Sequence, residues 1–202
     1  MAAVGCVEGG EEEGAAGRAE EQWVGAEEVC EGVFSGAGSR QLERATGTVE
    51  FFTTQAPGYV NDLPSLLEAI RNLDGYEQGF CRIHAASVDL GVPNLRFYFR
   101  WEPSHLVVAE EDSDLWDDPA NVFYDHGEKA LTLGENDAFL YFSCGVAGRE
   151  GHLLTARLHM KPGAEPDERM VLLNSLSRSV AEGLGCLEES GLSDSSPREM
   201  DR

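Results

Sequence analysis

The sequence predicts an α+β fold: a mostly antiparallel sheet or two packed sheets with two helices, between a disordered acidic N-terminal arm and a short C-terminal tail. Runs of β-branched and aromatic residues alternate with Gly- and Pro-containing turns through the middle of the chain, which is typical of strands. Two stretches repeat their apolar residues at helical spacing. These two patterns together indicate strands and helices in one domain.

Changes in composition set the expected domain boundaries. Residues 1–45 are rich in Gly, Ala and Glu, so we expect an arm that cannot bury enough apolar surface to offset its ordering entropy. Residues 46–183 are expected to form the globular domain. Residues 184–202 are expected to form a polar tail, mobile from about residue 190 onward.

The first strand and the first helix open the predicted domain. Residues 48–54 are enriched in Thr, Val and Phe, and Pro57 with Gly58 breaks this strand. Asp62 can then cap a helix that has Pro64 in its first turn. The apolar face of this helix consists of Leu63, Leu66, Leu67, Ile70 and Leu73.

More strands and a second helix follow. Strands are expected at 80–88, 95–101, 105–109, 122–124, 129–133, 138–146 and 152–160. Runs 95–101 and 105–109 should form one hairpin, and 138–146 with 152–160 another. The acidic stretch 110–118 should be a loop or an irregular helix. The second helix should run from about 166 to 182, with a buried face of Met170, Leu173, Leu176, Ser177 and Val180.

The net charge of −22 restricts the classes of ligand. A chain so acidic should be repelled by nucleic-acid phosphates and by anionic membrane surfaces, so we expect neither as a direct ligand. The sequence has no segment long and apolar enough to span a bilayer and no secretory or mitochondrial leader pattern. Cytoplasm and nucleus are therefore the expected locations, where the five cysteines should be free thiols.

A short motif near the C-terminus carries the most specific functional signal. Leu184, Cys186 and Glu188 form the pattern LxCxE, and an acidic, serine-rich stretch follows. In an extended segment, these alternate side chains project from one face. A branched apolar group, a small apolar group and a carboxylate on one face suit a segment that binds in a groove of another protein.

The motif resembles the retinoblastoma-binding motif of viral transforming proteins, such as those of papillomaviruses and the large T antigens of polyomaviruses. The resemblance implies that Leu184 and Cys186 enter an apolar groove of a retinoblastoma-family pocket protein, and that Glu188 meets backbone N–H groups there. It also implies release of the transcription factors that the pocket protein restrains. In those families an acidic residue often precedes the leucine, whereas this chain has Gly183.

The composition around the motif adds two expectations. The Gly-, Ala- and Glu-rich chain resembles a parapoxvirus accessory protein, which implies interference with host innate defence, for example with NF-κB activation. The tail serines Ser193, Ser195 and Ser196 are candidate phosphorylation sites. Phosphates there would add about −1.5 to −2 charges each, and we expect them to strengthen pocket-protein binding through faster association.

Two alternatives compete with this interpretation. Leu184 and Leu187 could complete the apolar face of the preceding helix, with Cys186 as a small core residue. The folded domain could instead hold a host signalling protein through its sheet face or the Trp116 loop, with LxCxE incidental.

Catalytic and metal sites have weaker support. Cys81 and His84 would point to opposite faces of a strand, as would His152 and His159, so neither pair suits one metal ion. Three aspartates and one histidine could act as general acids or bases: Asp117, Asp118, Asp125 and His126. No nucleophile motif or phosphate-binding glycine loop accompanies them. We therefore expect a non-enzymatic protein without cofactor or metal.

Overall fold

A nine-stranded, mostly antiparallel sheet lies at the centre of the computed structural model, which describes residues 22–86, 95–108, 113–161 and 164–201. The strands are β1 (Phe51–Thr54), β2 (Tyr59–Val60), β3 (Gln78–Ala85), β4 (Leu95–Pro103), β5 (Val122–Asp125), β6 (Lys129–Leu133), β7 (Asp137–Ser143), β8 (His152–Met160) and β9 (Arg198–Glu199). Their order is β1-β3-β4-β8-β7-β6-β5-β9, with β2 parallel to β3. The predicted α+β class is confirmed.

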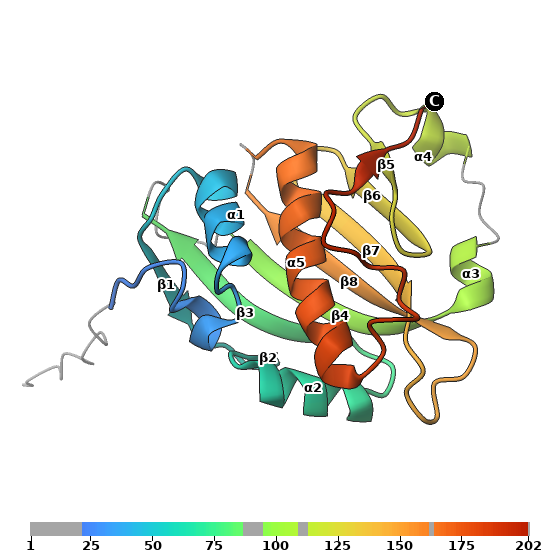
Figure 1. Cartoon of the computed structure of the whole chain (residues 1–202), viewed down its shortest axis with the longest axis horizontal. Coiled ribbons are helices and arrows are strands. Elements are labelled where there is room, and N and C mark those ends of the chain that lie inside the picture. Colours follow the sequence, from blue (N-terminus) through green and yellow to red (C-terminus); the bar gives the residue numbers. More distant parts are fainter. Residues whose placement is uncertain (1–21, 87–94, 109–112, 162–163, 202) are drawn as a thin grey trace, which may run out of the picture.

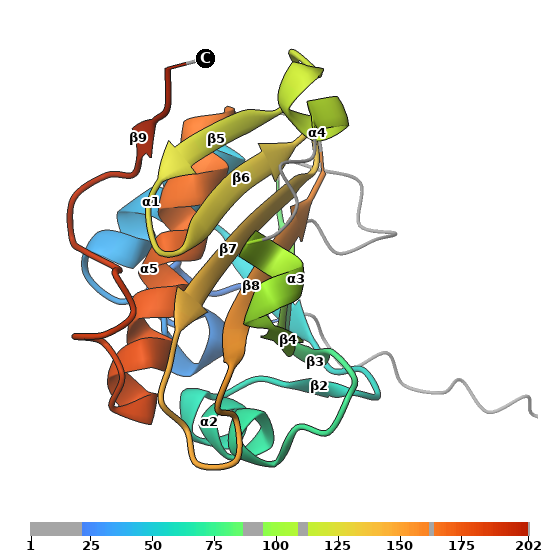
Figure 2. The same cartoon turned by 90° about the vertical axis from the view of Figure 1, so that its right-hand side faces the viewer.

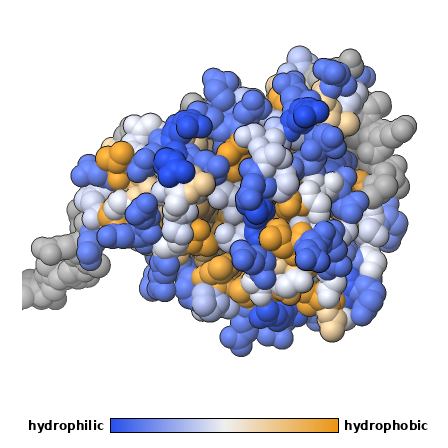
Figure 3. Space-filling model, in the orientation of Figure 1, coloured by the Kyte–Doolittle hydropathy of each residue, from blue (hydrophilic) through white to orange (hydrophobic). Residues whose placement is uncertain are grey.

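Helices form the second layer. They are the 3-10 helix η1 (Val29–Gly32) and the α-helices α1 (Ala37–Thr46), α2 (Leu63–Asn72), α3 (Ser104–Val108), α4 (Ser113–Asp117) and α5 (Pro166–Leu184). α1 and α5 lie across one face of the sheet, with α2 below them in the view of Figure 1. The outer surface of this layer is mostly hydrophilic, with hydrophobic residues scattered over it (Figure 3). None of the described helices is long and apolar enough to cross a membrane.

The two predicted helices form for the expected local reasons. The side chain of Asp62 accepts a hydrogen bond of 2.7 Å from the Ser65 N–H, which caps α2. A capping box between Glu165 and Glu168 begins α5. A Cβ on Gly183 would lie 2.4 Å from Leu67, so the glycine lets the end of α5 approach α2. The two helices therefore pack closely where α5 ends.

One predicted hairpin is wrong. Residues 104–108 form α3 and not a strand, and β4 pairs with β3 on one side and β8 on the other. The physical reason is that β8 matches β4 residue by residue from Leu95↔Met160 to Pro103↔His152. Both edges of β4 are thus filled, and a hairpin partner has no free edge to join.

The N-terminal boundary is also different from the prediction. Residues 22–45 belong to the domain: Val24 bridges to Phe51, and Val29, Phe34 and Leu42 are fully buried. These few apolar side chains lie on η1, on α1 and between them, and they pack into the core of the domain. Burial of each contributes about 1.5–3 kcal/mol, which offsets the polar composition around them. Of the predicted arm, residues 1–21 lie outside the described part of the chain.

The C-terminal segment is docked, in contrast to the predicted mobile tail. Ser190 and Leu192 are buried, and the Asn174 amide donates a hydrogen bond of 3.1 Å to the Ser193 carbonyl. β9 then pairs antiparallel with β5. A few buried groups and the strand pairing fix this segment despite its polar sequence.

Candidate functional site

The LxCxE segment lies in a turn at the end of α5. Leu184 is the last helical residue, and Gly185 adopts φ 83°, the left-handed conformation that ends many helices. The Cys186 N–H then donates to the Ala181 carbonyl at 2.8 Å. The three motif side chains therefore do not alternate along an extended strand. The prediction of an extended, exposed motif differs from the structure because the helix cap determines the local backbone.

Cys186 is a core residue. Its exposed fraction is 3%, and it forms a disulfide with Cys144. Leu184 and Leu187 pack against the same core. This arrangement agrees with the alternative stated above, in which these leucines complete the apolar face of the helix. Of the motif, Glu188 alone is exposed.

The expectation of free thiols is contradicted at four cysteines. Besides Cys144–Cys186, a second disulfide joins Cys30 to Cys81, and both of these residues have positive φ angles. The spacing of the cysteines gives no hint of the pairing, since 51 and 42 residues separate the partners. The fifth cysteine, Cys6, lies outside the described residues.

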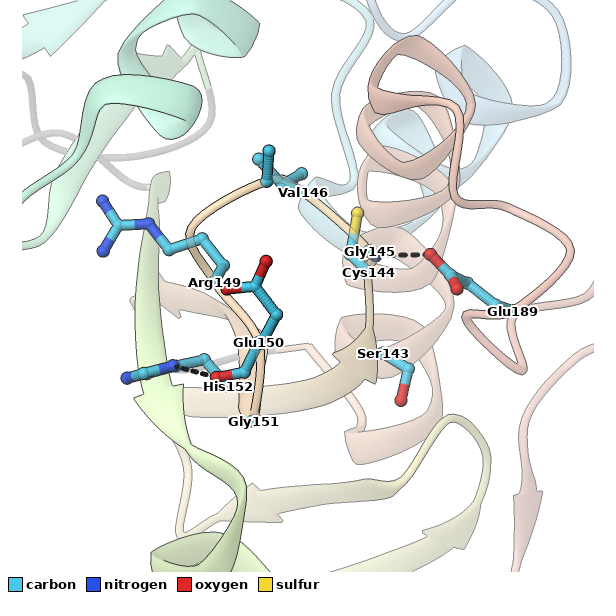
Figure 4. A pocket seen from close by; sticks show the side chains of 10 residues that line it. Ser143, Cys144, Gly145, Val146, Arg149, Glu150, Gly151, His152 and Glu189 are labelled. Carbon is cyan, nitrogen blue, oxygen red and sulfur yellow. Dashed lines mark hydrogen bonds between the residues drawn. The ribbon is translucent and has the colours of Figure 1, made fainter.

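A shallow hollow lies beside the motif, between the β7–β8 loop and the segment after α5. The Glu189 carboxylate accepts a hydrogen bond from the backbone N–H of Gly145. Figure 4 shows this contact and, on the other wall, the side chains of Arg149, Glu150 and His152. Arg149 is already engaged, because it donates to the Leu73 carbonyl. The hollow is thus bordered by a hydrogen-bonded junction, and neither Leu184 nor Cys186 lines it.

The candidate phosphorylation sites are accessible. Ser193, Ser195 and Ser196 are exposed, and the hydroxyls of Ser193 and Ser195 lie 2.6 Å apart. Asp194 between them forms an ion pair with Arg178 of α5. A phosphate on Ser193 or Ser195 would therefore add charge beside an existing acidic group.

The face of the sheet opposite α5 is the second candidate, and we call it the open face. Its residues follow from the strand register. One row comprises Arg82, Arg96, His159 and Asp137, and the next comprises Tyr98, Arg157, Phe139, Leu131 and Phe123. Among the described residues, the short helices α3 and α4 cover part of this face (Figure 2): the Trp116 ring of α4 lies 4.0 Å from that of Phe123, and Lys129 contacts the Val107 carbonyl of α3.

Arginines and aromatic rings are interleaved on the uncovered part of the open face. The Arg157 guanidinium lies 5.8 Å from the centre of the Tyr98 ring and 5.4 Å from that of Phe139. Arg82 lies 5.7 Å from the Tyr59 ring in the same way. These distances are typical of cation–π contacts. The alternation of Arg96, Tyr98 and Arg100 was visible in the sequence, but its continuation onto β3, β7 and β8 requires the register.

The other candidate residues are not gathered into one cluster in the described part of the chain. Cys81 is in a disulfide, and His84 stacks on Phe52 at 4.3 Å. His126 is buried and contacts the Asn174 amide oxygen at 2.7 Å. Asp117, Asp118 and Asp125 are exposed. His152 contacts the Glu150 carbonyl, whereas His159 contacts the Asp137 carboxylate. No group of three potential metal ligands occurs among the described residues.

Comparison of the chain with protein-family models, with curated proteins and with solved structures found no match.

Proposed function

We propose that this chain is a non-enzymatic binding protein that holds a partner protein on its open face. The observation that carries the proposal is the surface of interleaved guanidinium groups and aromatic rings formed by Arg82, Tyr98, Phe139 and Arg157, which no described helix covers. Arginine and tyrosine dominate the energetics of protein interfaces, because both offer a large contact area and directed hydrogen bonds. Such a surface in a chain of net charge −22 favours an acidic segment of the partner.

The test uses a photo-crosslinking residue at two matched positions. One replaces Phe139 on the open face, and the other replaces Arg40, which is exposed on α1 on the opposite side. In extract, we expect a crosslinked protein from the first position and not from the second. The same product at both positions, or none at Phe139, would contradict the proposal.

A retinoblastoma-family pocket protein is a second candidate partner, favoured by the exposed carboxylate of Glu188 two residues after Cys186. Binding in the manner of the viral motif requires Leu184 and Cys186 to leave the core, so the Cys144–Cys186 disulfide must first be reduced. Pull-down of pocket proteins with and without reductant tests this. We expect capture only with reductant, and none by Cys186→Gly/Glu188→Ala; capture by this variant would refute the second candidate.

The location of the protein depends on the same disulfides. Two disulfides favour an oxidising compartment, whereas cytoplasm and nucleus are the locations expected from the sequence. Alkylation of the protein in intact cells, followed by mass analysis without reductant, distinguishes the two. Four protected cysteines would support the oxidising compartment, and four alkylated ones the cytoplasm or nucleus.

A further inference from the structure

Two arginines face each other across neighbouring strands of the open face. Arg82 on β3 is the direct partner of Arg96 on β4, so their side chains leave the same face of the sheet about 5 Å apart at Cβ. Like charges at such a pair destabilise a sheet. Neither guanidinium has a carboxylate partner among the described residues. Within the described part of the chain, the pair is therefore a double positive charge without a compensating acid, although the sequence has 37 acidic residues.

The nearby carboxylates are occupied elsewhere. Asp137 Oδ1 lies 3.0 Å from Arg157 Nη2 and 3.1 Å from His159 Nδ1. Glu77 lies 3.9 Å from both Arg100 and Arg157. The remaining acid, Glu102, pairs with Arg100. Arg100, Arg157 and His159 therefore engage these acids, and no described carboxylate compensates the charge of Arg82 or Arg96.

Polar groups beside the pair complete the site. Gly79 has no side chain, and a Cβ there would lie 2.8 Å from the Tyr59 ring, so the glycine admits this ring onto the open face next to Tyr98. The Tyr59 hydroxyl donates to the Tyr98 hydroxyl at 2.6 Å, so the Tyr98 proton is available to an acceptor. The Nε of Arg96 is shielded from solvent and has no hydrogen-bond partner among the described residues.

We infer that Arg82, Arg96 and Tyr98 bind a phosphate monoester on a phosphorylated side chain of the partner protein. This inference rests on the proposed function and names the group that the open face recognises. A phosphate monoester carries about −1.5 to −2 charges, which matches two guanidinium groups, and its three oxygens suit their N–H donors and one hydroxyl. A nucleic acid is disfavoured, because its extended charge would meet the acidic surface beyond the site.

The probe is a synthetic tripeptide, acetyl-Gly-phosphoserine-Gly-amide, titrated into the full chain and followed by the NMR signals of the arginine Nε–H groups. We expect saturable shifts for Arg82 and Arg96, and none with the unphosphorylated tripeptide. Arg96→Gln should weaken binding at least about tenfold, because a charge-assisted hydrogen-bonded pair is lost. Arg44→Gln, which removes the same charge on the exposed side of α1, should leave the affinity unchanged.

Several results would overturn the inference. These are equal binding of both tripeptides, unchanged affinity of Arg96→Gln, or stronger competition by a mixed-sequence single-stranded oligonucleotide. Arg82→Gln is a second variant that controls for misfolding. It removes a contact between like charges, so it should abolish binding without lowering the thermal midpoint of the protein. Phosphatase treatment of the extract separates the two proposals. A crosslink at Phe139 that survives it keeps the proposed function and refutes the phosphate, whereas absence of any crosslink refutes the function itself.

Discussion

Removing the disulfide beside the LxCxE segment should lower the free energy of unfolding substantially. We consider Cys144→Ala/Cys186→Ala, which replaces two buried cysteines by a small apolar residue. The disulfide links positions 42 residues apart, and the loop entropy that it removes from the unfolded chain corresponds to about 4 kcal/mol. Domains of this kind are stable by about 5–15 kcal/mol, so the double variant should lose a large share of its stability.

The assay is urea unfolding without reductant, followed by circular dichroism. The expected result is a lower midpoint together with a steeper dependence on denaturant, because the unfolded variant is more expanded. Cys30→Ala/Cys81→Ala is the matched comparison. Its separation of 51 residues predicts nearly the same loss, since the entropy depends on the logarithm of loop length. A loss below about 1 kcal/mol for the Cys144/Cys186 variant would refute the reasoning.

Three further predictions concern stability. Phe34→Ala should lower the free energy of unfolding by about 3–5 kcal/mol in denaturant titration, because Phe34 is fully buried. A loss below about 0.5 kcal/mol, which is typical of an exposed residue, would instead mean that Phe34 lies in a solvent-exposed arm, as the sequence predicted. Asp62→Ala should cost about 1 kcal/mol by loss of the α2 cap to Ser65, whereas Asp62→Asn should retain most of it. Burial, and then the hydrogen bond to Asp167, raises the pKa of Tyr124 above its ordinary value of 10.0. The folded state therefore keeps this phenol protonated to a higher pH than the unfolded chain does. The free energy of unfolding is unaffected by Tyr124 below about pH 10 and falls as the pH rises above it. Tyr124→Phe should make this fall smaller in unfolding titrations at successive pH values, and an unchanged fall would exclude Tyr124 as a source of it.

The sequence predicted those elements whose periodicity is strong. The leucines of α2 and the alternation along β4 gave the correct helix and strand, because both elements bury one face against a continuous core. The segment after β4 was mistaken because its apolar residues favour a strand locally, whereas the edge available to it depends on β8, about 50 residues later. Register over such a distance is not encoded in local propensity.

In the candidate sites, too, the sequence revealed local patterns and not long-range contacts. Leu184, Cys186 and Glu188 matched a linear motif, but the same spacing occurs where a helix ends at a glycine and the next residue turns into the core. The pairing of Cys186 with Cys144 could not be deduced from sequence separation. The open-face pair Arg82 and Arg96 was missed because the two residues lie on different strands, and only their register makes them neighbours.

The short strand β9 has a consequence for how copies of this protein behave in concentrated solution. An unpaired strand at the edge of a sheet is a template on which other chains can add, and this is a common start of aggregation. Here Arg198 and Glu199 cover the edge of β5, and the Met200 N–H adds a hydrogen bond to the Phe123 carbonyl at 2.9 Å. The covering strand is only two residues long and carries both signs of charge, so it offers little for a further strand to extend. Residues 198–200 thus protect the edge of β5, and we expect a truncation before Arg198 to expose this edge to strand pairing with other chains.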